Sequence, residues 1–255
     1  MIYGLYLSAT GVLTNSYRQD VISNNIANAE TVGFKKDLAL FQQRPTAAQE
    51  AGNPGASNRL LESLGGGIFA SPTRIDTSQG DLEPTSNSLD IGIQGNGYFK
   101  VSDGIKTNLT RDGRFMLDYT GHLVMGNHVG QQVLDQKDRP IQFDLKLSGK
   151  PITINEQGVI TQEGKPVGTL GLYDVTDSSK LQKQGGNLMS HPDVANLRPA
   201  NGIMRGGFVE RANVEPATEL ALLMDSQRQL EANANMIRYQ DQTLARLVND
   251  VGKIS

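Results

Sequence analysis

The strongest hydrophobic pattern lies near the C-terminal end of the sequence. Apolar residues recur there at alternating steps of three and four, the spacing of a helix that packs along one face. The positions in this stripe are Leu220, Leu223, Gln227, Leu230, Ala234, Ile237, Asp241, Leu244, Val248 and Val251, with polar breaks at Gln227 and Asp241. Pro216 is tolerated in a first helical turn, and Asn213 is a candidate N-cap. The pattern predicts a helix from Pro216 to Val251 with a coiled-coil seam.

A weaker helical stripe occupies the beginning of the chain. Its apolar positions are Ile2, Leu5, Tyr6, Ala9, Val12 and Leu13, followed after a polar interval by Ile26. The segment holds Asn15, Asn24, Asn25 and Asn28, and asparagine is a poor helix former. Packing by neighbours on several sides must therefore support this helix. Gly33 offers a left-handed helix stop, and Phe34 is placed to fold back on the last turn.

The long middle part shows the pattern of short strands. Leu89, Ile91 and Ile93 alternate with other residues, and frequent turn residues follow. Asn96-Gly97 and Asp112-Gly113 each predict a hairpin. Further turns are predicted at 119–121, 126–127, 135–138, 155–158 and 163–164. Residues 45–67 are rich in Pro, Ala, Gly and Ser, which favours a linker or an extended arm.

These patterns predict an α+β fold in which N- and C-terminal helices form a coiled-coil domain and bracket a mainly antiparallel β domain. The predicted segments are an N-terminal helix within 1–36, a linker or arm over 37–67, a β-rich domain over 68–210 and a C-terminal helix within 211–255. A lone antiparallel pair would leave part of each apolar stripe exposed. We expect other subunits to cover the stripes, although apolar helical spacing also fits an intramolecular core.

Composition narrows the function. With 24 basic and 27 acidic residues the chain lacks the basic excess of a nucleic-acid binder. No cysteine is present, which excludes disulfides and thiolate chemistry. His122, His128 and His191 are not three or four positions apart, and no Gly-x-Ser-x-Gly motif occurs. We therefore assign no catalytic, cofactor-binding or metal-binding residue and predict that the protein is not an enzyme.

The sequence predicts neither a membrane-spanning helix nor a secretory signal peptide. No apolar run approaches the length of about 18 residues that a membrane-spanning helix needs. The apolar start of the chain has no basic segment before Arg18, so it is a poor secretory signal peptide. A protein of this kind that leaves the cytoplasm would use a route without a cleaved signal.

Several separated motifs resemble those of the bacterial flagellar axial proteins, the family of rod, hook and hook-associated proteins. The N-terminal match is Asn24-Asn-Ile-Ala-Asn28 followed by Thr31-Val-Gly33-Phe34-Lys35. The central matches are Gly80-Asp-Leu82, the stretch from Leu89 to Phe99, Thr110-Arg-Asp-Gly113-Arg-Phe115 and the stretch from Leu181 to Asn187. The C-terminal match covers Glu219 to Arg228 and Asp241 to Leu244. Chain length and the single β domain are similar to the proximal and distal rod proteins.

The resemblance implies a structural subunit that repeats head to tail into a helical tube. It implies an inner coiled-coil layer, an outer β layer, torque transmission to the hook and a lumen for exported subunits. Implied partners are other copies, other axial proteins, the surrounding rings and the type III export apparatus, in a basal body that crosses the periplasm. The expected assembly-interface residues are Leu5, Ala9, Val12, Asn24, Asn25, Ile26, Ala27, Asn28, Gly33, Phe34, Leu220, Leu223, Gln227, Leu230, Ala234, Ile237, Asp241, Leu244, Val248 and Val251.

Other readings stay open at this point. A β binding module, such as an adhesin, displayed on a closed coiled-coil oligomer would show similar patterns and would form discrete dimers or trimers. An enzyme would need a concave polar cluster that the sequence does not reveal.

Overall fold

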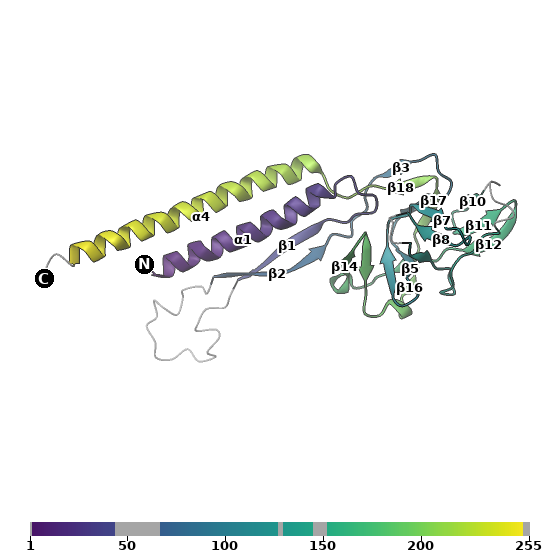
Figure 1. Ribbon diagram of the computed structural model, residues 1–255, viewed down its shortest axis with the longest axis horizontal. Helices are drawn as coiled ribbons and strands as arrows, with labels where there is room; N and C mark the ends of the chain where they lie inside the picture. The colour runs from purple at the N-terminus through teal and green to yellow at the C-terminus, as the bar shows by residue number, and fades with distance from the viewer. Residues whose placement is uncertain (1, 44–66, 127–129, 145–151, 252–255) are drawn as a thin grey trace. The chain divides into compact units, whose positions relative to one another are not determined.

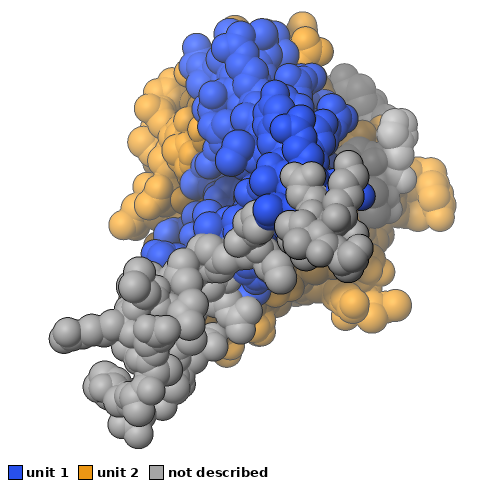
Figure 2. All heavy atoms as spheres, turned by 90° about the vertical axis from the view of Figure 1, so that its left-hand side faces the viewer, with its two compact units in different colours: residues 1–27, 37–74, 215–255 blue, residues 28–36, 75–214 orange. Residues whose placement is uncertain are grey.

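Both predicted terminal helices are present in the computed structural model, which describes residues 2–43, 67–126, 130–144 and 152–251. Helix α1 spans Ile2–Ala27 and helix α4 spans Pro216–Val251. The chain divides into two compact units, coloured separately in Figure 2. The helical unit holds residues 1–27, 37–74 and 215–255, and the strand unit holds residues 28–36 and 75–214. An α+β fold with a mainly antiparallel β region is confirmed.

The helical unit is built on α1 and α4, which lie antiparallel and side by side (Figure 1). Strands β1 (Asp37–Gln43) and β2 (Ile68–Ile75) pair beside them. Tyr17 of α1 packs edge-on against Phe41 with ring centroids 6.2 Å apart. The Tyr17 hydroxyl also donates to the Ser71 carbonyl at 3.2 Å, so α1 contacts both strands. The expected arm therefore begins as a strand, while its part over residues 44–66 lies outside the described residues.

The strand unit contains a seven-stranded sheet with the order β14-β15-β6-β5-β9-β8-β7. Its recorded strand pairs are antiparallel. Smaller sheets join β10-β11-β12, β13-β16, β17-β4 and β18-β3. The strands are β3 Leu82–Pro84, β4 Ile91–Gln94, β5 Phe99–Ser102, β6 Thr107–Thr110, β7 Phe115–Leu117, β8 Leu123–Met125, β9 Gln132–Val133, β10 Ile152–Ile154, β11 Val159–Gln162, β12 Lys165–Thr169, β13 Tyr173–Asp174, β14 Gln182–Gly185, β15 Leu188–Ser190, β16 Arg198–Pro199, β17 Ile203–Gly206 and β18 Phe208–Glu210.

An aliphatic core closes the strand unit. Its buried cluster combines Ile, Val, Leu and Met side chains with few aromatic rings, as the low aromatic content predicts. Phe99 and Phe115 meet edge to face at its centre with ring centroids 5.2 Å apart. Burial of this apolar surface is the main stabilising contribution to the unit.

The turns predicted at Asn155–Gly158 and Glu163–Gly164 join β10 to β11 and β11 to β12, and each forms an antiparallel hairpin. The hairpins predicted at Asn96-Gly97 and Asp112-Gly113 are wrong, because β4 pairs with the distant β17 and β7 pairs with β8. Gly113 serves a close approach of the backbone instead. The Ile91 N–H donates to the Gly113 carbonyl at 2.9 Å, and a methyl group on Gly113 would collide with Ile91 O.

The helix termini differ from the prediction in two respects. Helix α1 ends at Ala27, so Gly33 is not its stop. Asn213 does not cap α4, which begins at Pro216 as predicted and therefore takes Glu215 as its capping residue. The side chain of Asn213 binds other segments of the strand unit. Neither described helix is both long and apolar enough to cross a membrane.

We predict that Gly113→Ala destabilises the strand unit by about 2–4 kcal/mol, because the new methyl group forces β4 and residue 113 apart. Urea unfolding of the full chain followed by circular dichroism measures the change. Gly168→Ala is the matched control, since its methyl group would meet Ile141 side-chain atoms at 3.5 and 3.6 Å, an ordinary contact distance. Equal stability of the two variants would contradict the close approach at Gly113.

Candidate functional site

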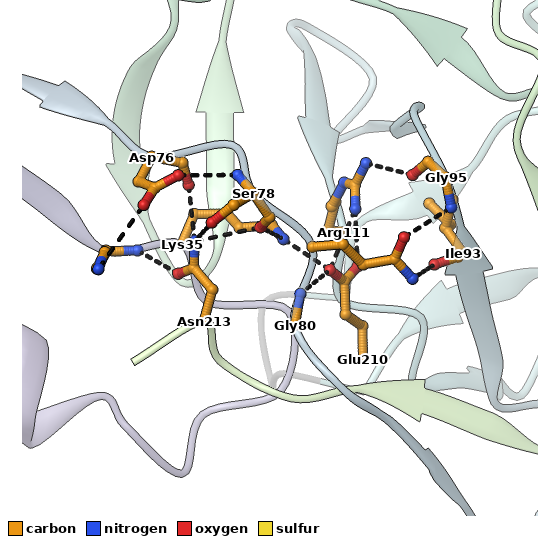
Figure 3. Close-up of polar contacts among 11 residues, drawn as sticks. Lys35, Asp76, Ser78, Gly80, Ile93, Gly95, Arg111, Glu210 and Asn213 are labelled. Carbon is orange, nitrogen blue, oxygen red and sulfur yellow. Dashed lines mark hydrogen bonds and ion pairs between the residues drawn. The ribbon is translucent and has the colours of Figure 1, made fainter. Parts of the chain in front are cut away.

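A buried ion cluster, formed by Lys35, Arg111 and Glu210, lies in the strand unit (Figure 3). Lys35 Nζ lies 2.6 Å from Glu210 Oε1, and Arg111 Nη1 lies 3.1 and 3.0 Å from the two oxygens of the same carboxylate. Lys35 and Glu210 are completely buried, and Arg111 is 3% exposed. Charged side chains are rarely buried unless they are paired, so the two cations depend on one carboxylate.

Backbone groups add further hydrogen bonds to this cluster. The Gly80 N–H donates to Glu210 Oε1 at 2.9 Å, and Lys35 Nζ donates to the Ser78 carbonyl at 2.6 Å. Arg111 Nη2 donates to the Gly95 carbonyl at 2.8 Å. Burial lowers the pKa of Lys35, and the facing carboxylate of Glu210 opposes that shift. The cluster therefore holds segments that are far apart in the sequence.

Asn213 makes a second junction next to the ion cluster. Its side-chain oxygen accepts from the Lys36 N–H at 2.8 Å, and its amide donates to the Asp76 carbonyl at 3.0 Å (Figure 3). The same amide donates to the Ser78 hydroxyl oxygen at 2.9 Å. Residues 35–36, 76–80 and 210–213 are thereby fixed to one another. The chain enters or leaves the helical unit within a few residues of each of these segments.

Gly33 and Phe34 lie in the same region of the strand unit. Gly33 has φ +71°, and a methyl group on it would lie 2.5 Å from the Asp112 backbone nitrogen. Its N–H donates to the Glu210 carbonyl at 2.7 Å. Phe34 is buried with Ala29 and Val214. The glycine is thus required by a close backbone approach, which a helix-stop argument does not reveal.

The asparagines of the N-terminal motif have different environments. Asn25 is buried, and it exchanges two hydrogen bonds with the backbone of Asp37, at 3.0 and 2.9 Å. Its amide also lies 3.5 Å from Glu219 Oε2. Asn24 is exposed, and Asn28 accepts a hydrogen bond from the Thr31 hydroxyl at 3.4 Å. The side-chain amide of Asn25 is therefore satisfied by backbone groups of the same chain.

The seam between α1 and α4 differs in phase from the predicted stripe. Of the predicted positions on α4, Leu223, Leu230, Ala234, Ile237 and Leu244 are half-buried, whereas Leu220, Gln227, Asp241 and Val248 are exposed. The side chain of Val251 lies outside the description. On α1, Leu5, Ala9, Val12 and Ile26 are half-buried and Ala27 is exposed. Leu220 and Val248 therefore do not belong to the seam of a single chain.

The column that does face α1 lies one residue earlier. Glu219 contacts Asn25, and the Ser226 hydroxyl donates to the Asn15 carbonyl at 3.1 Å. Asn233 packs on Gly11 and Gln240 on Gly4. An apolar pattern does not find these polar residues, because the glycines opposite them leave the space that they fill.

Large apolar side chains remain exposed on the helical unit. Leu13 and Val248 are each 70% exposed, Tyr239 is 64% exposed and Leu220 is 52% exposed. The helical exposed surface is defined by Tyr6, Leu7, Leu13, Leu220, Leu222, Met224, Met236, Tyr239, Leu247 and Val248. Exposed apolar side chains in this number favour contact with another protein.

The residues that α1 and α4 bury are mostly polar. Among the described residues of α1 and α4, the buried apolar residues are Val21 and Ile22. The buried polar residues of the same helices are Ser8, Asn15, Asn25, Glu219 and Ser226. Within the described part of the chain, no group of three or more His, Asp or Glu residues could hold a metal ion.

Three family models match the chain. One described as "Flagella basal body rod protein" matches residues 5–35, and one described as "Flagellar hook protein FlgE/F/G D1 domain" matches residues 92–162. A third, described as "Flagellar basal body rod FlgEFG protein C-terminal", matches residues 205–250. The first and third models therefore cover much of α1 and α4, and the second covers part of the strand unit.

Whole-chain relatives agree with these matches. The chain is 33% identical to the flagellar basal-body rod protein FlgG of Bacillus subtilis, over 98% of this chain and 99% of the relative. It is 31% identical to the flagellar basal-body rod protein FlgF of Caulobacter vibrioides, over 98% of each. With its helices, strand unit and motif residues all inside these alignments, the chain belongs to the flagellar basal-body rod protein family.

Proposed function

We propose that this chain is a structural subunit of the flagellar basal-body rod that assembles with copies of itself into a helical tube. The observation that carries the proposal is the distribution of apolar side chains in the helical unit. Its helices bury mainly polar residues and leave ten large apolar side chains exposed, as named above for the helical exposed surface. Copies of the chain can cover this surface through repeated head-to-tail contacts, which generate an open helical polymer.

The contacts would form an inner coiled-coil layer from the α1 and α4 helices of neighbouring chains. Leu220 and Val248 are free of the intrachain seam and available to such neighbours. Their spacing continues the three-and-four stripe of the sequence. The remaining interface candidates are Leu5, Ala9, Val12, Asn24, Asn25, Ile26, Ala27, Asn28, Gly33, Phe34, Leu223, Gln227, Leu230, Ala234, Ile237, Asp241, Leu244 and Val251.

The tube would transmit torque to the hook and pass exported subunits through its lumen. The buried ion cluster supports the mechanical part of this proposal. Lys35 and Glu210 stand close to the places where the chain passes between its two units, and their contact is fully desolvated. Removing one partner of such a pair leaves an uncompensated buried charge, so the cluster resists being pulled apart.

Family membership extends the proposal to partners and location. We expect contacts with other rod and hook proteins, with the surrounding rings and with the type III export apparatus, in a rod that crosses the periplasm. Export would leave the N-terminus uncleaved. Relatives named FlgG and FlgF have similar identities to this chain, so both rod classes remain candidates. A role without catalysis and without cofactors is part of the same proposal.

The rival function, a β binding module on a closed oligomer, is not favoured. The relatives that match almost the whole chain are named rod proteins. The two functions differ in the product of assembly, since a rod subunit forms open filaments and a binding module forms discrete oligomers.

We predict that Leu220→Asp combined with Val248→Asp abolishes polymerisation of the purified chain. Both side chains are exposed in the single chain, so the helix pair loses no internal packing while an apolar contact between chains gains two charges. Electron microscopy and sedimentation measure filament formation. Ile105→Asp is the control, because Ile105 is 89% exposed in the strand unit. Filaments of the double variant, or discrete trimers of the unmodified chain, would contradict the proposal.

We predict that Glu210→Gln lowers the free energy of unfolding by about 3–5 kcal/mol, because it leaves two buried cations without a carboxylate. Lys35→Met should cost less, since Arg111 and Glu210 remain paired. Denaturant unfolding measures both values. A smaller loss in the Glu210 variant than in the Lys35 variant would show that the carboxylate is not the centre of the cluster.

We further predict that α1 and α4 pair only weakly in the single chain and become fully ordered on assembly. In hydrogen exchange of the unassembled chain, amides of α1 and α4 should exchange much faster than core amides such as those of Phe99 and Leu109, because local stability follows buried apolar contacts. Polymerisation should protect the helices. Strong protection of both helices in a true monomer would refute this order of events.

A further inference from the structure

The contact between α1 and α4 repeats at steps of seven residues on both helices. Gly4 faces Gln240, Gly11 faces Asn233, and Asn25 faces Glu219. On α4, Ser226 occupies the same column between Asn233 and Glu219. We call these residues, Gly4, Gly11, Asn25, Glu219, Ser226, Asn233 and Gln240, the polar column.

The two glycine positions fit their partners closely. A methyl group on Gly11 would lie 2.8 Å from Asn233 Nδ2 and 2.9 Å from its Cγ. A methyl group on Gly4 would lie 2.7 Å from Gln240 Nε2. Real Cβ atoms are not found that close to their neighbours, so any larger residue at either position must displace the amide opposite.

The size relation is reversed at the next step. The α1 residue seven positions after Gly11 is Arg18, whose guanidinium lies 5.4 Å from the centre of the Phe41 ring. The matching α4 residue is Ser226, which is completely buried and has a short side chain. A small residue on one helix therefore accompanies a large one on the other at each of these steps.

We infer that the polar column determines the register in which α1 pairs with α4. In the observed alignment, Gln240 and Asn233 fill the space left by glycines, and Glu219 reaches Asn25. A slip of one heptad, about 10 Å, would bring Asn233 to the level of Arg18. The same slip would separate Glu219 from Asn25. The opposite slip would place the short Ser226 opposite Gly11 and would likewise separate Glu219 from Asn25. Only the observed alignment gives both glycines a long amide and joins Glu219 to Asn25.

The column specifies the partner more than it strengthens the pair. Gln240 Oε1 is buried and has no hydrogen-bond partner among the described residues. Burial of an unsatisfied polar atom opposes pairing, and polar residues at seam positions fix register at a cost in stability. This inference goes beyond the proposed function, because it concerns which helix positions meet and not what the polymer does.

Thiol cross-linking of the full chain tests the register. The chain contains no cysteine, so any cross-linked product comes from the introduced cysteine pair alone. Ser8 and Ile237 lie between the contact of Gly4 with Gln240 and that of Gly11 with Asn233. Ser8→Cys with Ile237→Cys probes the observed register, and Ser8→Cys with Leu244→Cys probes the slip of one heptad that brings Asn233 to Arg18. With a short bifunctional thiol reagent, we expect at least tenfold more product from the first pair.

Substitutions in the column then separate register from helix propensity. Gly11→Ala should reduce the yield of the first pair at least fivefold, although alanine is the better helix former. Adding Asn233→Ala removes the clashing amide and should restore the yield to within twofold. Ser16→Ala, on the exposed side of α1, is the control and should change nothing. An unchanged yield in Gly11→Ala, or no recovery with Asn233→Ala, would overturn the inference.

The experiment is independent of assembly. Cross-linking is carried out before and after polymerisation, and the mass of the product separates links within a chain from links between chains. Failure to polymerise would refute the rod assembly and leave the register measurable in the single chain. A full assembly with equal yields of the two probe pairs in both states would refute the polar column alone.

Discussion

The Glu210 carboxylate is the group on which the strand unit depends most. It is fully buried, and it accepts hydrogen bonds from Lys35, Arg111 and the backbone N–H of Gly80. These partners come from three distant parts of the sequence, so no local segment can neutralise the buried charges alone. Folding of the unit must therefore bring all of these parts together before the charges leave water, which couples their ordering.

The helical unit follows a different rule. Its buried residues are mostly polar, and its large apolar side chains remain in contact with water in the single chain. Because hydrophobic burial is the dominant favourable contribution to folding and association, the proposed assembly would supply much of the stability of this unit. Ser226 and Asn25 are satisfied by hydrogen bonds inside the chain. The polar residues between the two helices therefore need no partner from another chain.

Much of the fold follows from the sequence pattern. The bounds of α4 and the antiparallel strands were predictable, because a sustained three-and-four repeat and frequent turn residues are strong local signals. The phase of the seam was not. The stripe with Leu220 and the column with Glu219 are adjacent on one helix, and periodicity alone does not say which of them faces α1.

Long-range pairing explains the other differences. Asn96-Gly97 has the local chemistry of a hairpin, yet β4 pairs with β17 from the far end of the strand unit. Gly33 has the local chemistry of a helix stop, yet a glycine is needed there because the backbone of Asp112 lies so close. A residue type shows which conformations are accessible, and the partner that selects one of them is set by tertiary packing. The ion cluster was hidden for the same reason, since Lys35 and Glu210 become partners only in the folded chain.

Apolar and polar contacts thus have separate roles in this molecule. Apolar surface is non-directional, so the exposed side chains of α1 and α4 can supply strength to a contact without selecting its alignment. The polar contacts are directional and close-fitting, as at Gly11 with Asn233, and they select an alignment while adding little strength. A subunit of the proposed assembly would benefit from this separation of roles between apolar and polar contacts, because it has to stay monomeric until it binds other copies of itself. Its helices would bind weakly to one another in isolation and tightly only where many aligned copies cover the apolar surface together.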